Sequence, residues 1–315
     1  MDQQHVTATG EAEHPDVTVV IPTRDRPDLL RQAVDAVVAQ EYAGRVHVLV
    51  VFDGTSPDPG LERQGEQRRV TTTTNVRSPG LAGGRNTGLE AATTELVAFC
   101  DDDDVWHPLR LARQTALLTT RPDAVMATCG IRVRYADVSV DRRLEAEAVL
   151  HADLLRSRLT ELHPSTFLMR REPLLREVGL VDEAIPGSYA EDYDFLLRVA
   201  RVAPLANVPD ALVDVRWHER SFFEGRWRTI VEALEWLLRR HPEFHGERRG
   251  HARVLGQIAF AEAAQGHRRA AVGRAVQTLL RWPLEPRAAL AVAVASGAAS
   301  PERVLRALHR RGKGV

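Results

Sequence analysis

The chain has 315 residues, 44% of them hydrophobic and 27% charged, which excludes collagen-like, low-complexity and disordered classes and allows two domains, or one large domain with an appendage. The formal net charge of −1 hides a split, because residues 1–215 carry 23 basic and 34 acidic residues, whereas residues 216–315 carry 19 and 9. The two parts have net charges of −11 and +10, which favours docking between them.

A strand–helix–strand unit is expected near the beginning of the chain. The β-branched run 17–21 predicts a buried strand, Pro27 begins a helix that reaches about Gln40, and the apolar run 46–52 predicts a second strand. A crossover of this kind joins parallel strands, so the sequence predicts an α/β sheet.

Strands and helices continue to alternate up to about residue 215. Strands are expected over 69–76, 96–100 and 124–134, and helices over 85–92, 108–120 and 191–202. No strand is evident beyond that point, and helices are expected over 226–240, 250–265, 268–281, 287–296 and 301–311. The resulting division is a flexible N-terminus, an α/β domain and a helical domain, over residues 1–15, 16–220 and 221–315.

The compartment is expected to be the cytoplasm. Two cysteines, Cys100 and Cys129, are too few for a disulfide framework or a zinc ribbon and are typical of a reducing environment. The polar N-terminal segment 1–16 lacks the apolar core of a secretory signal. The stretch 288–299 is about half the roughly 20 residues that a membrane span needs. We expect a soluble protein, with peripheral contact to the inner face of the membrane left open.

Four consecutive acids, from Asp101 to Asp104, directly follow a buried strand. Their mutual repulsion costs Coulomb energy unless a cation offsets it. Strand alternation places Asp101 and Asp103 on the same side, and carboxylate oxygens suit Mg²⁺ or Mn²⁺, which also bind substrate phosphates. The run therefore favours a divalent-metal site over a solvated acidic loop.

Asp53 also stands at the end of a predicted strand. Ligands of open α/β sheets bind outside the carboxyl ends of the strands, so Asp53 and Asp101 should lie on one rim. Asp53-Gly54 alone is an ordinary turn signal. Beside the aspartate run, Asp53 becomes a candidate contact for a ribose or a base edge.

The segment 80–88, GLAGGRNTG, is predicted to be a Gly-rich loop that opens a helix. It matches neither the dinucleotide fingerprint nor the P-loop. Free backbone N–H groups and the planar donor Arg85 could still bind a phosphate. An ordinary helix start is an equally good interpretation.

Two further candidates are ambiguous by themselves. Acids at the start of the helix 191–202, including Glu191 and Asp192, are favoured by the helix dipole, or one of them is a general base. His218 is either a structural residue or a third metal ligand. The sequence contains no HExxH, GxSxG or CxxC, so zinc-protease, serine-hydrolase and thioredoxin chemistry have no support.

Taken in order, these motifs resemble the family-2 glycosyltransferases, whose nucleotide-binding fold is the GT-A type. The resemblance covers about residues 15–220 and is carried by VTVVIPTRDRPDLLRQAVDAVVAQ, VLVVFDGT, GLAGGRNTGLEAATTELVAFCDDDDVWHPLRL, HPSTFLMRREPLLREVGLVDE and AEDYDFLLRVA. It implies a Rossmann-like catalytic domain followed by an all-α segment. The implied enzyme is a metal-dependent, hexosyltransferase-type protein that moves a sugar from a nucleotide-diphosphate donor with inversion. The donor is expected to be a UDP-sugar, with TDP- and GDP-sugars left open.

The resemblance also implies roles for individual positions. Thr23 and Asp53 would contact the base and the ribose, Asp192 would be the general base, and Asp101, Asp103 and His218 would hold Mn²⁺ or Mg²⁺. The wider nucleotide-sugar site would comprise Pro22, Thr23, Arg24, Asp53, Arg85, Asp102 and Glu191.

The chain departs from the family pattern in three places. Phe52 replaces the first of two acids that usually end the second strand. The four aspartates leave the metal-binding pair open between Asp101/Asp103 and Asp102/Asp104. A QxxRW motif is absent from the sequence, which argues against a processive polysaccharide synthase.

Other functions remain open. A nucleotidyltransferase would normally carry a Gly-rich loop after the first strand, and the segment 22–27 has no glycine. A non-catalytic module would act through its helices, which could equally form a simple cap, an acceptor-binding surface, a homodimer contact or a membrane contact. The acceptor itself, whether glycan, lipid-linked, peptide or small molecule, has no signal in the sequence, and no nucleic-acid partner is expected.

Overall fold

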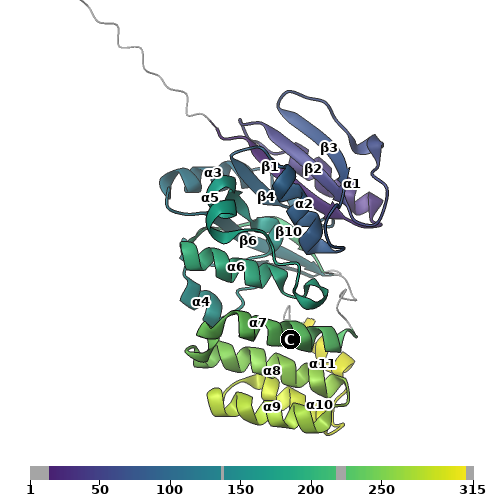
Figure 1. The fold of residues 1–315 in the computed structure, drawn as a ribbon, viewed down its shortest axis with the longest axis vertical. Helices are drawn as coiled ribbons and strands as arrows, with labels where there is room; N and C mark the ends of the chain where they lie inside the picture. The colour runs from purple at the N-terminus through teal and green to yellow at the C-terminus, as the bar shows by residue number, and fades with distance from the viewer. Residues whose placement is uncertain (1–13, 136–137, 218–224, 310–315) are drawn as a thin grey trace, which may run out of the picture.

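The computed structural model describes residues 14–135, 138–217 and 225–309. Figure 1 shows the strands β1–β4 at one end of an elongated molecule and the helices α8–α10 at the other, with α4, α6 and α7 between them. The α/β architecture followed by helices, predicted from the sequence, is confirmed.

The first half of the sheet is parallel. The strands β1 (Val17–Thr23), β2 (Val46–Phe52), β3 (Arg68–Thr74) and β4 (Leu96–Phe99) pair in the order β3-β2-β1-β4. The connection from β1 to β2 runs through α1 (Pro27–Val38) and that from β3 to β4 through α2 (Leu81–Ala91), whereas β2 and β3 are joined through the short turn η1 (Pro59–Leu61). Parallel pairing places the carboxyl ends of β1, β2 and β4 on one edge of the sheet.

The second half makes the sheet mixed. Beyond β4 the order continues with β9 (Leu168–Arg170), β6 (Met126–Tyr135), β10 (Leu205–Arg216) and β5 (Val105–Trp106). β9 is antiparallel to both β4 and β6, whereas β10 is parallel to β6. Two short strands complete it in the described residues, β7 (Val138–Arg142) on β6 and β8 (Ala148–Val149) on β10.

The remaining helices cover the sheet and form a separate helical layer beside it. Within the α/β unit the further helices are α3 (Arg110–Thr120), α4 (His151–Arg156), α5 (Arg171–Pro173) and α6 (Glu191–Val202). Short helical turns lie between α4 and β9 and between α5 and α6. The five expected C-terminal helices are present as α7 (Trp227–Arg240), α8 (Arg248–Ala264), α9 (Arg268–Arg281), α10 (Pro286–Ala295) and α11 (Pro301–His309). None of the described helices combines the length and the apolar character that crossing a bilayer requires.

Two local expectations were wrong. The Gly-rich segment is not a free loop, because residues 81–84 form the first turn of α2 after Gly80 turns the chain with a φ of +113°. A side chain at Gly83 would meet the carbonyl oxygen of Ser78, so only glycine allows this turn to pack there. β3 ends at Thr74, before the predicted Val76, where the side chain of Asn75 turns to bind Asp53.

The two faces of the sheet bury different cores. One core joins Val19, Ile21 and Val48 to α1, and the other joins Val20, Val51 and Phe99 to α2 and α6. The second core also contains residues of the C-terminal helices, among them Leu234, Leu237, Val254 and Ile258. Apolar burial therefore fixes α7 and α8 on the α/β unit, while the division of the chain at residue 220 stays a prediction.

The contact between α8 and the α/β unit is close at Gly250. A Cβ atom at this position would lie 1.7 Å from the carbonyl oxygen of Leu155, which is backbone and cannot rotate away. We expect Gly250→Ala to lower the free energy of unfolding by about 2–3 kcal/mol, measured by urea denaturation.

Gly273 on α9 is the matched control, because a Cβ atom there meets nothing within 4 Å. Gly273→Ala should raise the free energy of unfolding by about 0.5–1 kcal/mol, since it removes backbone freedom from a helix. Equal effects of the two substitutions would contradict the close approach of α8 to Leu155.

Candidate active site

The edge of the sheet expected to bind a ligand carries Asp53 directly after β2. Its carboxylate accepts hydrogen bonds from the side-chain amide of Asn75 at 2.8 Å and from the backbone N–H of Gly80 at 3.0 Å. Arg24, largely exposed, lies 3.9 Å from the same carboxylate. Asp53 is thus held at the rim, between the ends of β1 and β2 and the start of α2.

The end of β1 reaches the aspartate run. Thr23 donates from Oγ1 to Asp102 at 2.8 Å, and Arg26 donates to Asp102 at 3.3 Å and to Asp103 at 2.7 Å. Burial raises the pKa of Asp102 to about 6, although the Thr23 hydrogen bond acts to lower it. Pro22, the remaining rim residue of β1, packs near Gly84 of α2.

Arg85 occupies the centre of the site. Its guanidinium is almost fully buried, and it donates to Glu191 and to Asp101 at 2.7 Å each. Burial acts to lower the pKa of Arg85, but Asp101 and Glu191 raise it above its ordinary value. One side chain of α2 therefore joins the end of β4 to the start of α6.

The two carboxylates that Arg85 binds have different protonation behaviour. The pKa of Asp101 is lowered, because Arg85 and His163 outweigh its burial. Burial and the neighbouring Asp192 raise the pKa of Glu191 to about 7, although Arg85 acts to lower it. Asp101 is thus the anion at this end of the rim.

The aspartate run alternates in exposure. The side chains of Asp101 and Asp103 are 18% and 15% exposed, whereas those of Asp102 and Asp104 are 9% and 1% exposed. Asp104 accepts from Ser165 at 2.5 Å and faces His163 on the inner side of the run. Asp101 and Asp103 are the members of the run that face the open side.

His163 also lies beside the run. Its Nδ1 is 3.3 Å from Asp104, its Nε2 is 3.9 Å from Asp101, and candidate ligand atoms of all three residues lie within 4.8 Å of one another. Although burial acts to lower it, the pKa of His163 rises to about 9 beside Asp104 and Asp101. These three residues offer carboxylate oxygens and an imidazole nitrogen to a divalent cation, and His163 would have to release its proton to bind one.

Sequence reasoning missed three of these residues. Arg26 follows the first strand, Asn75 follows the third, and His163 begins the HPSTF segment. The HPSTF segment is one of the stretches that carry the family resemblance, which could have pointed to His163. No feature of the neighbouring sequence indicates a role for this histidine. His218, expected as a metal ligand, lies outside the described residues.

The three acids at the start of α6 bind different partners. Glu191 binds Arg85, Asp192 accepts from Arg158, and the fully buried Asp194 accepts from His241 and Arg198 at 2.8 Å each. The hydrogen bond from His241 and the charge of Arg198 lower the pKa of Asp194 against the effect of its burial. Asp192 is the one of these three whose side chain stays partly exposed at the rim, at 15%.

The backbone is strained directly before α6, and the first turn of the helix is held by hydrogen bonds to other elements. Ala190 has a φ of +65°, in the left-handed region that costs a non-glycine residue of order 1 kcal/mol. Tyr193 then donates to the carbonyl oxygen of Leu154 at 2.6 Å and accepts from Arg253 of α8 at 2.8 Å. The helical layer thus supports the residue next to Asp192.

We expect Arg85→Gln to lower the free energy of unfolding by about 3–5 kcal/mol, because it leaves two buried carboxylates without their cation. Urea denaturation at pH 7 measures the loss. Arg121→Gln removes a surface pair with Glu147 and should cost less than about 0.5 kcal/mol. Similar costs for the two variants would contradict the bridging role of Arg85.

The model of the family described as glycosyl transferase family 2 matches residues 18–176, half of the chain. An amylovoran biosynthesis glycosyltransferase of Erwinia amylovora is 24% identical over 205 residues, covering 64% of this chain and 75% of its own length. An uncharacterized glycosyltransferase of Rickettsia felis is 25% identical over 218 residues, or 66% of this chain. The match spans only 35% of that relative's length.

Solved structures share the fold over nearly the whole chain. TarS residues 1–349 of S. aureus, solved with UDP-GlcNAc, align with a TM-score of 0.61 at 16% identity, covering 95% of this chain and 92% of theirs. A mannosyltransferase of Pyrobaculum calidifontis, solved with GDP-Man and Mn²⁺, aligns with a TM-score of 0.58 at 21% identity, covering 93% and 83%. With a matching family model, a GT-A fold and acids gathered at the strand ends, this chain belongs to glycosyl transferase family 2.

Proposed function

We propose that the protein transfers a sugar from a nucleotide-diphosphate donor, a UDP-sugar, to an acceptor nucleophile with inversion at the anomeric carbon. The observation that carries the proposal is the buried Arg85, which holds Asp101 and Glu191 on one guanidinium. This contact brings the end of the sheet expected to bind the diphosphate next to Asp192. A donor bound there and a base at Asp192 would lie on the same side of one rim.

The nucleotide would bind along the ends of β1 and β2. Asp53 is fixed by Asn75 and Gly80, so its carboxylate is oriented in advance to accept from a base or a ribose hydroxyl. Thr23, Pro22 and the exposed Arg24 would complete this end. Solved relatives bind UDP-GlcNAc or GDP-Man, and a UDP donor for this chain follows from the family resemblance.

The donor diphosphate would lie at the aspartate run with a divalent cation. Asp101 and Asp103 would hold the cation, because they are the more exposed carboxylates and Asp104 is bound to Ser165. His218 is the third ligand proposed from the resemblance, and His163 offers an imidazole on the Asp104 side. A bound Mn²⁺ or Mg²⁺ would neutralise charge on the departing diphosphate.

Asp192 is the proposed general base. Glu191 is held by Arg85 and Asp194 is fully buried, so neither is free to meet an acceptor. Arg158 and the backbone N–H of Tyr193 donate to the two oxygens of Asp192 and orient its carboxylate. Asp192 takes the proton of the acceptor as the acceptor attacks the anomeric carbon and the nucleoside diphosphate leaves. One such displacement inverts the configuration.

We expect Asp192→Asn to lower kcat by about 10²–10⁴-fold, since the amide keeps the shape but cannot accept a proton. Affinity for UDP should change by less than about twofold, because the substitution leaves the donor site intact. Transfer and donor hydrolysis are measured with a panel of nucleotide sugars, with and without Mn²⁺.

Asp210→Asn is the matched control, because the Asp210 carboxylate pairs with Arg113 on the exposed surface and is not one of the rim acids. Full activity of Asp192→Asn would overturn the assignment of the base. Release of pyrophosphate from a nucleoside triphosphate would instead support a nucleotidyltransferase. Absence of transfer and of hydrolysis with every donor would support a non-catalytic module.

Asp103→Ala tests the metal assignment separately. We expect the affinity for the donor nucleotide to fall by about 10–100-fold in the presence of Mn²⁺, because the cation loses an oxygen ligand. Calorimetric titration of UDP measures this affinity. When the metal is chelated, the variant and the wild type should have the same affinity for UDP. Equal affinities in Mn²⁺ would show that Asp103 is not a ligand.

A further inference from the structure

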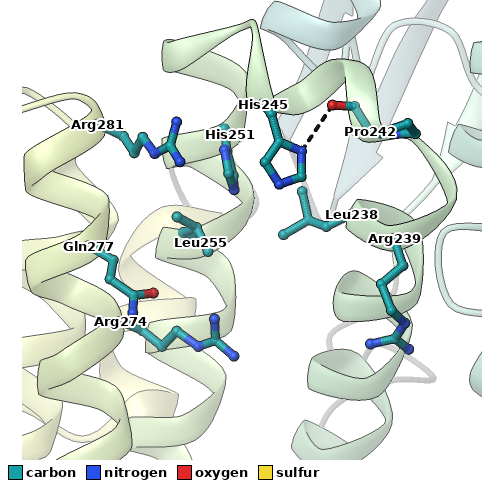
Figure 2. A pocket seen from close by; sticks show the side chains of 9 residues that line it. All are labelled: Leu238, Arg239, Pro242, His245, His251, Leu255, Arg274, Gln277 and Arg281. Atoms are coloured by element: carbon teal, nitrogen blue, oxygen red, sulfur yellow. Dashed lines mark hydrogen bonds between the residues drawn. The ribbon is translucent and has the colours of Figure 1, made fainter.

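A pocket lies in the helical layer, lined by residues of α7, α8, α9 and the turn η5 (Pro242–His245) (Figure 2). None of its lining residues belongs to the strand ends or to the start of α6. The volume of about 360 Å³ is at the small end of the range for ligand pockets. Three arginines and two histidines line it, without any acid among its described lining residues: Arg239, Arg274, Arg281, His245 and His251.

The positive charge in this pocket is only partly neutralised. Arg274 pairs with Glu235. For the guanidinium groups of Arg239 and Arg281, the described parts of the chain provide no carboxylate within ion-pair distance, and Arg281 is half-buried. Cations that face one small pocket repel one another unless an anion offsets them. The electrostatics of the pocket therefore favour an anionic ligand.

The histidines provide a second and independent indication. His251 is 6% exposed, and its Nδ1 is buried without a hydrogen-bond partner in the described residues. An unsatisfied buried polar atom costs about 1–3 kcal/mol, so its retention points to a missing partner. Figure 2 shows the rings of His251 and His245 side by side, with centroids 5.0 Å apart.

The hydrogen bonds available to the two rings suit an oxyanion. His245 donates from Nδ1 to the carbonyl oxygen of Pro242 at 2.9 Å, so its Nε2 can donate to an anion only when the ring is protonated, the form that a nearby anion favours. Burial, with Arg281 and His245 nearby, lowers the pKa of His251 to about 4. A bound anion would offset the charge of Arg281 and allow the imidazole to donate.

We propose that this pocket binds a phosphate group. Arg281 supplies a planar fork, the chemistry that matches phosphate oxygens, and His251 beside it supplies a further donor. The phosphate could belong to a soluble ester or to an anionic lipid head group. A lipid head group is included because α9 also exposes the apolar side chains of Val276 and Leu280, at 51% and 74%, which could contact a membrane surface.

The test is a phosphate titration followed by NMR of the assigned imidazole signals of His245 and His251. A readout local to the pocket is needed, because inorganic phosphate also fits the proposed donor site at the rim. We expect a saturable shift of both signals, and an affinity about tenfold lower in Arg281→Gln. Arg269→Gln, an exposed arginine of α9 outside the pocket lining, should leave the affinity unchanged.

His251→Gln is the second variant. In this variant the phosphate concentration that half-saturates the shift of the His245 signal should rise about tenfold. Absence of a saturable shift, or equal affinities in wild type and Arg281→Gln, would overturn the proposal. Sedimentation with phosphatidylglycerol vesicles, against phosphatidylcholine vesicles, then separates the sources. Binding that Arg281→Gln weakens and soluble phosphate competes away assigns the site to lipid, and phosphate binding without vesicle binding assigns it to a soluble ester.

Discussion

The architecture of the site depends on one buried guanidinium. Arg85 reaches Asp101 at the end of β4 and Glu191 at the start of α6, and it has almost no exposed surface. A cation buried this deeply is tolerated only because two carboxylates bind it, and the carboxylates in turn depend on it. The same contact holds the sheet edge and the helix that carries Asp192 in a fixed relation. Donor binding and acceptor activation are therefore proposed to share one electrostatic element.

The C-terminal helices take part in the same arrangement. Tyr193, next to Asp192, accepts from Arg253 of α8, and Asp194 accepts from His241 at the end of α7. Leu234 and Val254 are buried in the core that also contains Phe99 of β4. A substitution in α7 or α8 that disturbs these contacts would therefore alter the position of residues at the rim. The helical layer thus has a structural role that does not depend on any ligand of its own.

Local patterns predicted the fold well, and contacts between distant segments were beyond them. Periodicity located the parallel strands and the C-terminal helices, since apolar spacing reflects which face each element buries. The bond between Arg85 and Glu191 joins residues 106 positions apart, and no local signal pairs them. His163 had no assigned role, and Asp194, which the helix dipole would explain, is instead buried against His241. The strands could be predicted because each is formed by one continuous segment of the sequence. The site could be predicted only in part because its residues come from several distant segments.

The central claim is that the acids at the strand ends and at the start of α6 form one donor site. A crystal structure of the protein soaked with UDP and Mn²⁺ tests this most directly. The account predicts the base and ribose at Thr23 and Asp53, and the metal-bound diphosphate at Asp101 and Asp103, facing Asp192. A nucleotide bound elsewhere on the chain, or a diphosphate remote from the aspartate run, would contradict it.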